Sequence, residues 1–355
     1  MIHRLTCEHF FDGDILHGAH EIIIEDGLVT SVLPFSGVPE HFLISPGFID
    51  LQVNGFDDID VSNASAHDLF ALGSRLREHG TTHWLATLTT APREIFNRRI
   101  SAAHEYISSQ DIPGCIGIHL EGPHLGGRPG AHNPEWITSF TEREIESLPA
   151  SVQLMTLAPE QPNAAQHVRG LTMQGISVSL GHTSASRQEF VDAVDAGALL
   201  VTHVFNGMTG VHHRDGGIAL YALTEPRVSV GLIADLVHVS ADAIRLTFAA
   251  KGSSGVVLVS DSIAWRSERA LKRDISIDSG AALLPNGTLA GSCVPLAHCM
   301  RNCVTSAGIS LEDALRASTS SPADAMGWKN LGRIVTGQPV DINVLSEDLH
   351  VLETL

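Results

Sequence analysis

Residues 117–123 read Gly-Ile-His-Leu-Glu-Gly-Pro, an apolar run that stops at the carboxylate of Glu121 and then meets a Gly-Pro turn. This pattern is typical of a buried strand that delivers one acid to its C-terminal end. Later apolar runs stop in the same way at His182, His203 and Asp261. Barrel enzymes assemble metal sites from side chains that arrive singly at successive strand ends, so the sequence predicts a metal-dependent hydrolase.

Short apolar segments alternate with helical patterns along most of the chain. The candidate strands cover residues 48–53, 83–89, 115–120, 152–157, 177–181, 199–204, 228–234 and 256–260, and the clearest helical patterns cover residues 66–79, 92–108, 186–196 and 241–250. Strands that are buried on both faces are continuously apolar, so this alternation predicts an α/β fold built on a (β/α)8 TIM-type barrel. An open doubly wound sheet is the alternative, but it would gather its polar residues at one switch point instead of at many strand ends.

The two ends of the chain have a different, β-like pattern. Residues 21–25 and 28–33 flank an Asp26-Gly27 turn, which indicates a hairpin, and short strand patterns return at 332–335 and 341–345. Segments this small cannot bury a face alone. We therefore expect residues 1–45 and 332–355 to form one small β-sandwich-like domain, and residues 46–331 to form the barrel.

The segment after the last barrel strand has a hairpin pattern of its own. Residues 274–289 are predicted to form an inserted hairpin that turns at Pro285-Asn286-Gly287.

Composition narrows the function. The 355 residues include 22 basic and 40 acidic side chains, a formal net charge of -18. Because polyanions are held by counterion release to Lys and Arg, this charge does not suit a non-specific nucleic-acid binder, and we expect no nucleic-acid partner. A small anionic substrate remains compatible with local cations. No run approaches the roughly 18 apolar residues of a spanning helix, residues 1–10 do not resemble a signal peptide, and the five scattered cysteines suit a reducing compartment, so a cytoplasmic enzyme with no membrane partner is expected.

Three of the strand-end residues match the ligand chemistry of a catalytic cation. Such an ion takes three protein ligands, often two histidines and one carboxylate, and keeps one position open; Glu121, His182 and His203 supply that set. Asp261 is interpreted as a general base that takes a proton from metal-bound water and returns it to the leaving group. A turn or helix-capping aspartate is the alternative reading of Asp261.

Several motifs together resemble a known family. They are residues 46–55, 119–123, 181–183, 202–208, Asp261, 289–292 and 331–334, in this order. The set resembles the N-acetylglucosamine-6-phosphate deacetylases of the amidohydrolase superfamily, and it covers essentially the whole chain. The resemblance implies hydrolysis of N-acetylglucosamine 6-phosphate to glucosamine 6-phosphate and acetate, in amino-sugar catabolism. The alternatives are deacetylation of N-acetylgalactosamine 6-phosphate or another N-acyl substrate, or a catalytically silent sugar-phosphate binder.

The first strand departs from the pattern of many superfamily members. They carry His-x-His there and bind a second metal, whereas this chain has Gln52 and Asn54. Amides are poor ligands for such cations. The resemblance therefore implies one divalent metal per subunit, with zinc expected and iron, cobalt or manganese compatible with the same ligands. Gln52 is a candidate hydrogen-bond partner of a ligand, and Asn54 is interpreted as a packing amide at the rim of the core.

The resemblance also implies substrate contacts. It assigns Asn206, Gly207 and His238 to the phosphate, and His132 to the substrate carbonyl and sugar hydroxyls, where it would stabilise the oxyanion. Arg214 corresponds to an arginine that reaches across a homodimer interface into the neighbouring pocket.

Three residues depart from the family around this phosphate site. Gly207 and Gly216 stand where the family usually has alanine and proline, and both loosen the backbone. Leu236 stands where it has glycine. Because leucine adopts a positive φ only at a cost, we expect the loop before His238 to follow a different path.

Overall fold

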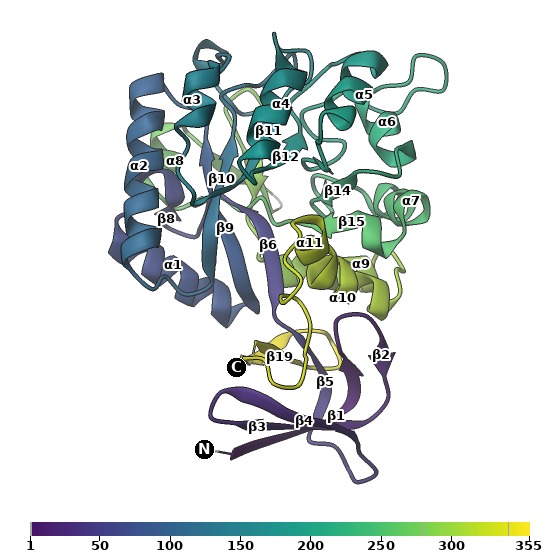
Figure 1. The fold of residues 1–355 in the computed structure, drawn as a ribbon. Coiled ribbons are helices and arrows are strands. Elements are labelled where there is room, and N and C mark those ends of the chain that lie inside the picture. The colour runs from purple at the N-terminus through teal and green to yellow at the C-terminus, as the bar shows by residue number, and fades with distance from the viewer. Residues whose placement is uncertain (1, 279, 340) are drawn as a thin grey trace.

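The computed structural model describes residues 2–278, 280–339 and 341–355. Its main body is an eight-stranded parallel sheet curled into a barrel, with the strands in chain order around it (Figure 1). These strands are β6 (Phe48–Val53), β9 (Thr81–Thr89), β10 (Cys115–Glu121), β11 (Val152–Leu157), β12 (Ser177–Leu180), β13 (Leu200–Val201), β14 (Ser229–Leu232) and β15 (Val256–Leu258). The barrel predicted from the sequence is confirmed, and the open doubly wound sheet is excluded.

The barrel closes just beyond the ends of its first and last strands. Val53 forms an isolated parallel bridge with Ser262, and the backbone N–H of Asn54 donates to the carbonyl of Ser262 at 2.9 Å. Between the same two parts of the chain, Oδ1 of Asp50 in β6 accepts from the backbone N–H of Ser260, which follows β15, at 3.2 Å. The closing contacts therefore flank Asp261 and hold its segment against the first strand.

Helices cover the outside of the barrel (Figure 1). They are α1 (Ala66–Glu78), α2 (Arg93–Ser109), α3 (Glu142–Glu146), α4 (Ala164–Met173), α5 (Arg187–Asp195), α6 (Ile218–Thr224), α7 (Ala241–Lys251), α8 (Glu268–Lys272), α9 (Leu296–Thr305), α10 (Leu311–Ser318) and α11 (Ser320–Ala325), with 3-10 turns at Val61–Asn63, Pro134–Trp136 and Ser253–Gly255. Capping boxes begin α1 at Ser65 and α5 at Ser186. The four helical patterns predicted from the sequence are all present.

Apolar side chains fill both sides of the barrel sheet. Ile49, Leu85, Leu154 and Val257 belong to a cluster inside the barrel, and a larger cluster lies between the strands and the helices. Burial of each such side chain contributes about 1.5–3 kcal/mol. This double burial explains why the strands are continuously apolar and why the polar residues are found at their ends.

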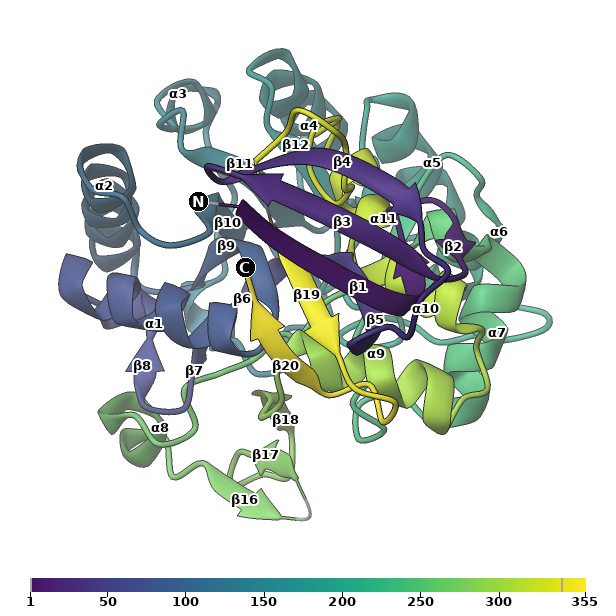
Figure 2. The ribbon, with the colours of Figure 1, turned by 90° about the horizontal axis from the view of Figure 1, so that it is seen from below.

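The two ends of the chain meet in a separate seven-stranded sheet, where both termini lie (Figures 1 and 2). Its main path runs β20-β19-β5-β1-β3-β4, and β2 pairs with β1. The strands are β1 (Ile2–Phe11), β2 (Leu16–His17), β3 (His20–Glu25), β4 (Leu28–Pro34), β5 (His41–Pro46), β19 (Ile342–Leu345) and β20 (Val351–Thr354). The predicted hairpin is present, with Asp26 and Gly27 at φ 50° and 79°.

Two details of the C-terminal prediction are wrong. Residues 332–335 are not a strand, and β20 was not foreseen. Arg333 instead pairs with the carboxylates of Asp14 and Asp324 at 2.9 and 2.8 Å. Asp14 lies between β1 and β2 and Asp324 lies in α11, so Arg333 links the small sheet to a helix of the barrel. The division of the chain after residues 45 and 331 into two domains stays a prediction.

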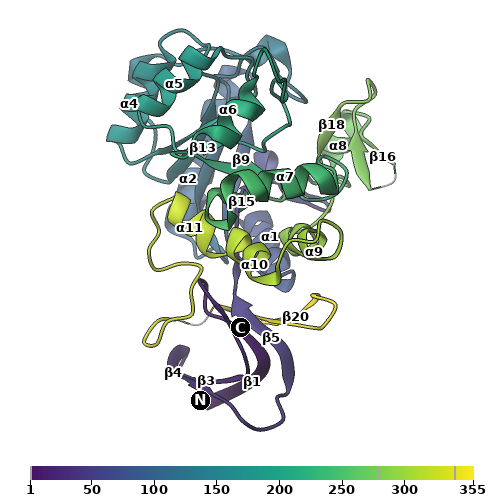
Figure 3. The same ribbon diagram turned by 90° about the vertical axis from the view of Figure 1, so that its right-hand side faces the viewer.

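The predicted insertion is larger than a single hairpin. It contains β16 (Ser276–Asp278), β17 (Ala281–Leu283) and β18 (Leu289–Ser292), with the predicted 285–287 turn between the last two. Figure 3 shows this unit projecting beside α8. A second small pair, β7 (Gly55–Phe56) and β8 (Ile59–Asp60), follows the first barrel strand. Among the described residues, no helix has both the length and the apolar character needed to cross a membrane.

Candidate active site

The strand-end residues reach the barrel mouth through sharp backbone turns. Glu121 is the last residue of β10, whereas His182, His203 and Asp261 each lie two or three residues beyond a strand end. Their φ angles are 49°, 28° and 48°, in the left-handed region that non-glycine residues rarely occupy. Such residues cluster at functional sites because the surrounding fold must hold them there. These turns also explain why β13 is shorter than its predicted 199–204 span.

Glu121 is the centre of the site. Its Oε1 lies 3.1 Å from Nε2 of His182 and 3.1 Å from Nε2 of His203, and its Oε2 lies 3.6 Å from Nε2 of His132. The carboxylate is almost fully buried. Burial favours a raised pKa, but the contacts with the three histidines hold the pKa of Glu121 well below its usual range.

The donor set around Glu121 fits a bound cation. Nδ1 of His182 lies 3.1 Å from the carbonyl oxygen of Arg128, which can only accept, so Nδ1 carries the ring proton. In the neutral ring, Nε2 then presents a lone pair to Oε1 of Glu121. Two acceptors that face each other at 3.1 Å are complementary to a positive ion. Metal-binding histidines commonly donate their other ring N–H to a backbone carbonyl, as His182 does to Arg128.

Two ligand sets are compatible with this geometry. The ligand atoms of Glu121, His132 and His182 all lie within 4.8 Å of one another, a set that differs from the sequence prediction in containing His132 in place of His203. His203 nevertheless contacts the same Glu121 oxygen as His182, at the same 3.1 Å. Both sets share Glu121 and His182.

Thr90 contacts both His132 and the backbone of Glu121. Its hydroxyl lies 2.9 Å from Nδ1 of His132 and 3.2 Å from the carbonyl of Glu121. The Glu121 carbonyl can only accept, so the Thr90 hydroxyl donates to it and accepts from Nδ1 of His132; in the neutral ring the proton is then on Nδ1, and Nε2 presents a lone pair toward Oε2 of Glu121. Burial first, and then the neighbouring charge of His182, lower the pKa of His132 to about 4, so the ring is neutral at pH 7.

The two first-strand amides bind the two site carboxylates. Nε2 of Gln52 donates to Oε1 of Glu121 at 2.9 Å, and Nδ2 of Asn54 donates to Oδ1 of Asp261 at 2.7 Å. Gln52 therefore contacts a candidate ligand, as expected. The interpretation of Asn54 as a packing amide is wrong, because its side chain lies in the site and orients Asp261.

Asp261 is placed for proton transfer. Burial first, and then the negative charge of Glu121, raise its pKa to about 6, against the opposing effects of His203, His238 and the Asn54 hydrogen bond. A carboxyl group with this pKa can both accept and donate a proton near neutrality.

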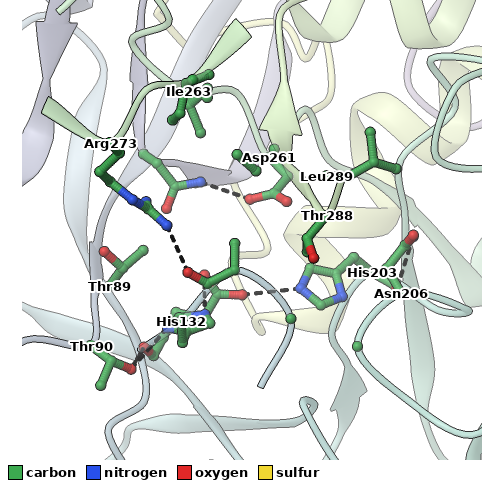
Figure 4. A pocket seen from close by; sticks show the side chains of 18 of the residues that line it. Thr89, Thr90, His132, His203, Asn206, Asp261, Ile263, Arg273, Thr288 and Leu289 are labelled. Atoms are coloured by element: carbon green, nitrogen blue, oxygen red, sulfur yellow. Dashed lines mark hydrogen bonds and ion pairs between the residues drawn. The ribbon is translucent and has the colours of Figure 1, made fainter. Parts of the chain in front are cut away.

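A cavity of about 320 Å³ opens above these residues. Figure 4 shows Thr89, Thr90, His132 and Arg273 on one side of it and His203 and Asn206 on the other. Of the predicted site residues, Glu121, His132, His182, His203, Asn206, Gly207, His238 and Asp261 all line this cavity. Arg214 does not: it is exposed on the loop before α6, outside the cavity of its own chain.

The predicted phosphate loop keeps a left-handed turn. Leu236 has φ 67°, so the expectation that leucine would avoid this conformation is wrong. Nδ1 of His238 lies 2.7 Å from Oδ2 of Asp235, which fixes the ring. At Gly207, which has φ 57°, a β-carbon would lie only 2.7 Å from Nδ1 of His182, so a larger residue here would require the His182 ring to shift.

Sequence reasoning missed three polar residues at the site. Arg269 and Arg273 line the cavity from the α8 segment, whose sequence shows only an ordinary charged helix. Glu160 lies behind His182: its Oε1 accepts from the backbone N–H groups of Gly127 and Ser184 at 3.0 and 2.8 Å. Its position three residues after β11, another strand end, is the signal that could have identified it.

Comparison with known proteins gives a consistent result. The amidohydrolase family model matches residues 43–354. Human N-acetylglucosamine-6-phosphate deacetylase is 34% identical over 335 residues, which cover 88% of this chain and 81% of the relative. N-acetylgalactosamine-6-phosphate deacetylase of Shewanella sp. is 32% identical over 316 residues, covering 86% and 80%. The solved N-acetyl-D-glucosamine-6-phosphate deacetylase mutant of Mycobacterium smegmatis, in complex with N-acetyl-D-glucosamine-6-phosphate, has a TM-score of 0.91 at 26% identity, covering 100% and 97%.

Proposed function

This chain belongs to the amidohydrolase family, and on that premise we propose that it hydrolyses N-acetylglucosamine 6-phosphate to glucosamine 6-phosphate and acetate. The observation that carries the proposal is the pairing of Asp261, a carboxyl group with a pKa of about 6, with the histidine-surrounded Glu121 in one cavity. A silent binder of sugar phosphates would need neither a proton-transfer group nor the Asn54 amide that orients it.

The proposed metal ligands are Glu121, His182 and His203. The equal contacts of the two histidines with one Glu121 oxygen support this set. A divalent ion held there, zinc in the proposal and iron, cobalt or manganese as alternatives, supplies Lewis-acid chemistry that polarises the amide carbonyl and activates water.

The chain's own residues then move the protons. Asp261 accepts the proton of the attacking water, and His132 stabilises the oxygen that gains negative charge; to donate from Nε2, its ring must take up the tautomer in which Thr90 donates to Nδ1 instead of to the Glu121 carbonyl. Asp261 next returns its proton to the sugar nitrogen, because an unprotonated amide nitrogen is too basic to leave. Asn54 keeps the carboxyl group of Asp261 aimed at the reaction centre throughout.

The proposed phosphate contacts are Asn206, Gly207 and His238, together with Arg214 from a second copy of this chain. Asn206 and Gly207 line the cavity, and the exposure of Arg214 suits a residue that serves a neighbouring subunit in a homodimer. The cytoplasmic location stays a prediction.

The kinetic comparison of three substrates tests the proposal. Metal-loaded protein should release acetate from N-acetylglucosamine 6-phosphate with a kcat/KM well above that for its galactosamine epimer and for unphosphorylated N-acetylglucosamine. A preference for the epimer would assign the chain to the activity of the Shewanella relative, and the absence of acetate from all three would favour the silent binder.

A further inference from the structure

His238 and Asp235 form a buried pair in the wall of the cavity. Nδ1 of His238 lies 2.7 Å from Oδ2 of Asp235, and the two side chains are only 5% and 3% exposed. Because His238 lines the cavity and Asp235 takes Nδ1, Nε2 is the ring nitrogen that is left for a ligand.

The carboxylate of Asp235 is held in one orientation. Its Oδ1 accepts from the backbone N–H groups of Val237 and His238 at 2.9 and 2.7 Å, and its Oδ2 faces the imidazole ring. Burial favours a raised pKa, but the contacts with His238 lower the pKa of Asp235 below its ordinary value, so this group is ionised at neutral pH. An ionised carboxylate can only accept, so the ring proton of His238 that faces it is on Nδ1.

This fixed proton decides what Nε2 can do. In the neutral ring only one nitrogen carries a proton, so Nε2 presents a lone pair, which repels a phosphate oxygen. In the imidazolium both nitrogens are donors, and Nε2–H can form a charge-assisted hydrogen bond with a phosphate while Asp235 balances the ring charge. Asn206 and Gly207 are uncharged. Of the three proposed phosphate contacts within one chain, His238 is therefore the one that can carry a positive charge.

We propose that Asp235 is a positioning residue that couples phosphate binding to a proton. It keeps neutral His238 from donating at Nε2, so His238 binds the phosphate only as the imidazolium, and the complex takes up one proton when the free ring is neutral. This role rests on the proposed function, in which the anion is the 6-phosphate of the sugar.

Four other titratable groups have pKa values that the charge of His238 or Asp235 affects. They are Asp261 after β15, Cys293 after β18, and His298 and Cys299 in α9. Burial raises the pKa of Cys293 to about 11 and that of Cys299 well above its ordinary value, and it lowers the pKa of His298. The pKa of Asp261, raised by burial to about 6, lies below pH 7. A change in phosphate affinity between pH 7 and pH 9 is therefore assigned to His238.

A ratio of two substrates isolates the phosphate contact. Titrations that affect both substrates cancel when kcat/KM for N-acetylglucosamine 6-phosphate is divided by kcat/KM for unphosphorylated N-acetylglucosamine. Between pH 7 and pH 9 the phosphate stays a dianion, because its second pKa is about 6. In the wild type the ratio should fall by roughly tenfold or more across this window, the contribution of one hydrogen bond to a charged group. A ratio that does not change with pH would overturn the proposal.

Asp235→Asn reverses the tautomer and keeps the loop contacts. The two backbone N–H groups hold the amide oxygen at the position of Oδ1, so the amide NH2 group faces Nδ1 and donates to it. The neutral ring then carries its proton on Nε2 and can donate to the phosphate throughout the window. The variant should have a lower ratio than wild type at pH 7 and no fall toward pH 9. A fall parallel to that of wild type would contradict the proposal, because Asp235 would then only hold the loop.

Two glutamine variants are the controls. His238→Gln keeps a donor that cannot titrate, so its ratio should be low and independent of pH. His298→Gln removes a nearby histidine that does not line the cavity, and it should keep the wild-type fall. A fall that persists in His238→Gln, or that disappears in His298→Gln, would assign the titration to another group and overturn the proposal.

Calorimetry separates failure of this proposal from failure of the deacetylase activity. Glucose 6-phosphate carries the phosphate but no amine or acyl group, and its binding at pH 8 can be measured in two buffers of different ionisation enthalpy. Wild-type protein should take up protons on binding, and Asp235→Asn should take up none. Proton uptake by wild type alone supports the proposal even in a protein that releases no acetate, whereas no binding, or binding without proton uptake, contradicts it.

Discussion

The side-chain amide of Asn54 donates to Oδ1 of Asp261 at 2.7 Å, so a residue of the first barrel strand directly holds the acid that follows the last one. This bond favours the ionised carboxylate and opposes the rise in the pKa of Asp261 caused by burial. Asn54→Leu should therefore raise that pKa and shift the acid limb of the pH profile of kcat/KM to higher pH, with metal content unchanged. An acid limb at the wild-type pH would show that Asn54 does not control Asp261.

His132 and His203 should respond differently to the same substitution. The proposed ligand set predicts that His203→Asn loses metal, whereas His132→Asn keeps it and loses kcat by about 100-fold or more, the effect of removing one oxyanion donor. Metal analysis of both purified variants decides between the sets. Metal loss in His132→Asn with retention in His203→Asn would assign His132 as the ligand.

Glu160 should support metal binding without touching the metal. Its carboxylate joins the loop of Gly127 to Ser184 and so fixes the two segments on either side of His182. Because outer contacts of ligands typically change metal affinity by 10–100-fold, Glu160→Gln should weaken metal binding by about tenfold. The control is Glu144→Gln, which makes the same exchange at the start of α3, where glutamine can still complete the capping box with Thr141, and which should leave metal affinity unchanged. Equal metal affinities of Glu160→Gln and wild type would contradict this role.

Asp50 should make stability depend on pH. Burial raises its pKa to about 7, and its Oδ2 has no hydrogen-bond partner among the described residues. Between about pH 4, the unfolded value, and pH 7 the folded state binds more protons than the unfolded state, so this group lowers stability as the pH rises through that window.

Asp50→Asn tests this effect, because it removes the titration and keeps an acceptor for Ser260. Between pH 4 and pH 7 the wild type should lose up to ~4 kcal/mol of unfolding free energy that the variant keeps. Urea unfolding of both metal-free proteins across this pH range measures the difference. A difference that is independent of pH would mean that Asp50 does not titrate in this range.

The barrel could be predicted from the sequence because its strands are buried on both faces and are therefore continuously apolar. The same pattern indicated Glu121, His182, His203 and Asp261 as candidate site residues, since an acid or imidazole directly after such a run has no role in packing, and the structure brings all four to one cavity. Residues 332–335 were misassigned because a short alternating run does not show whether a strand partner is present. Here Arg333 forms ion pairs instead of a ladder.

The remaining site residues depend on contacts that no local pattern encodes. Asn54 reaches Asp261 across a separation of 207 residues, which only closure of the barrel brings together. Arg269 and Arg273 belong to an ordinary charged helical segment in the sequence, and only the fold places them on the wall of the cavity. The positive φ of Leu236 was unexpected because the fold, and not the preference of leucine, sets that turn.

The most direct test of the proposed mechanism is to measure metal content and acetate release on the same preparations of Glu121→Gln and Asp261→Asn. The mechanism predicts that Asp261→Asn retains one metal ion per chain and releases no acetate from N-acetylglucosamine 6-phosphate, whereas Glu121→Gln retains no metal. Ordinary turnover by Asp261→Asn, or full metal content in Glu121→Gln, would contradict the division of the site into a metal-binding carboxylate and a proton-transferring one.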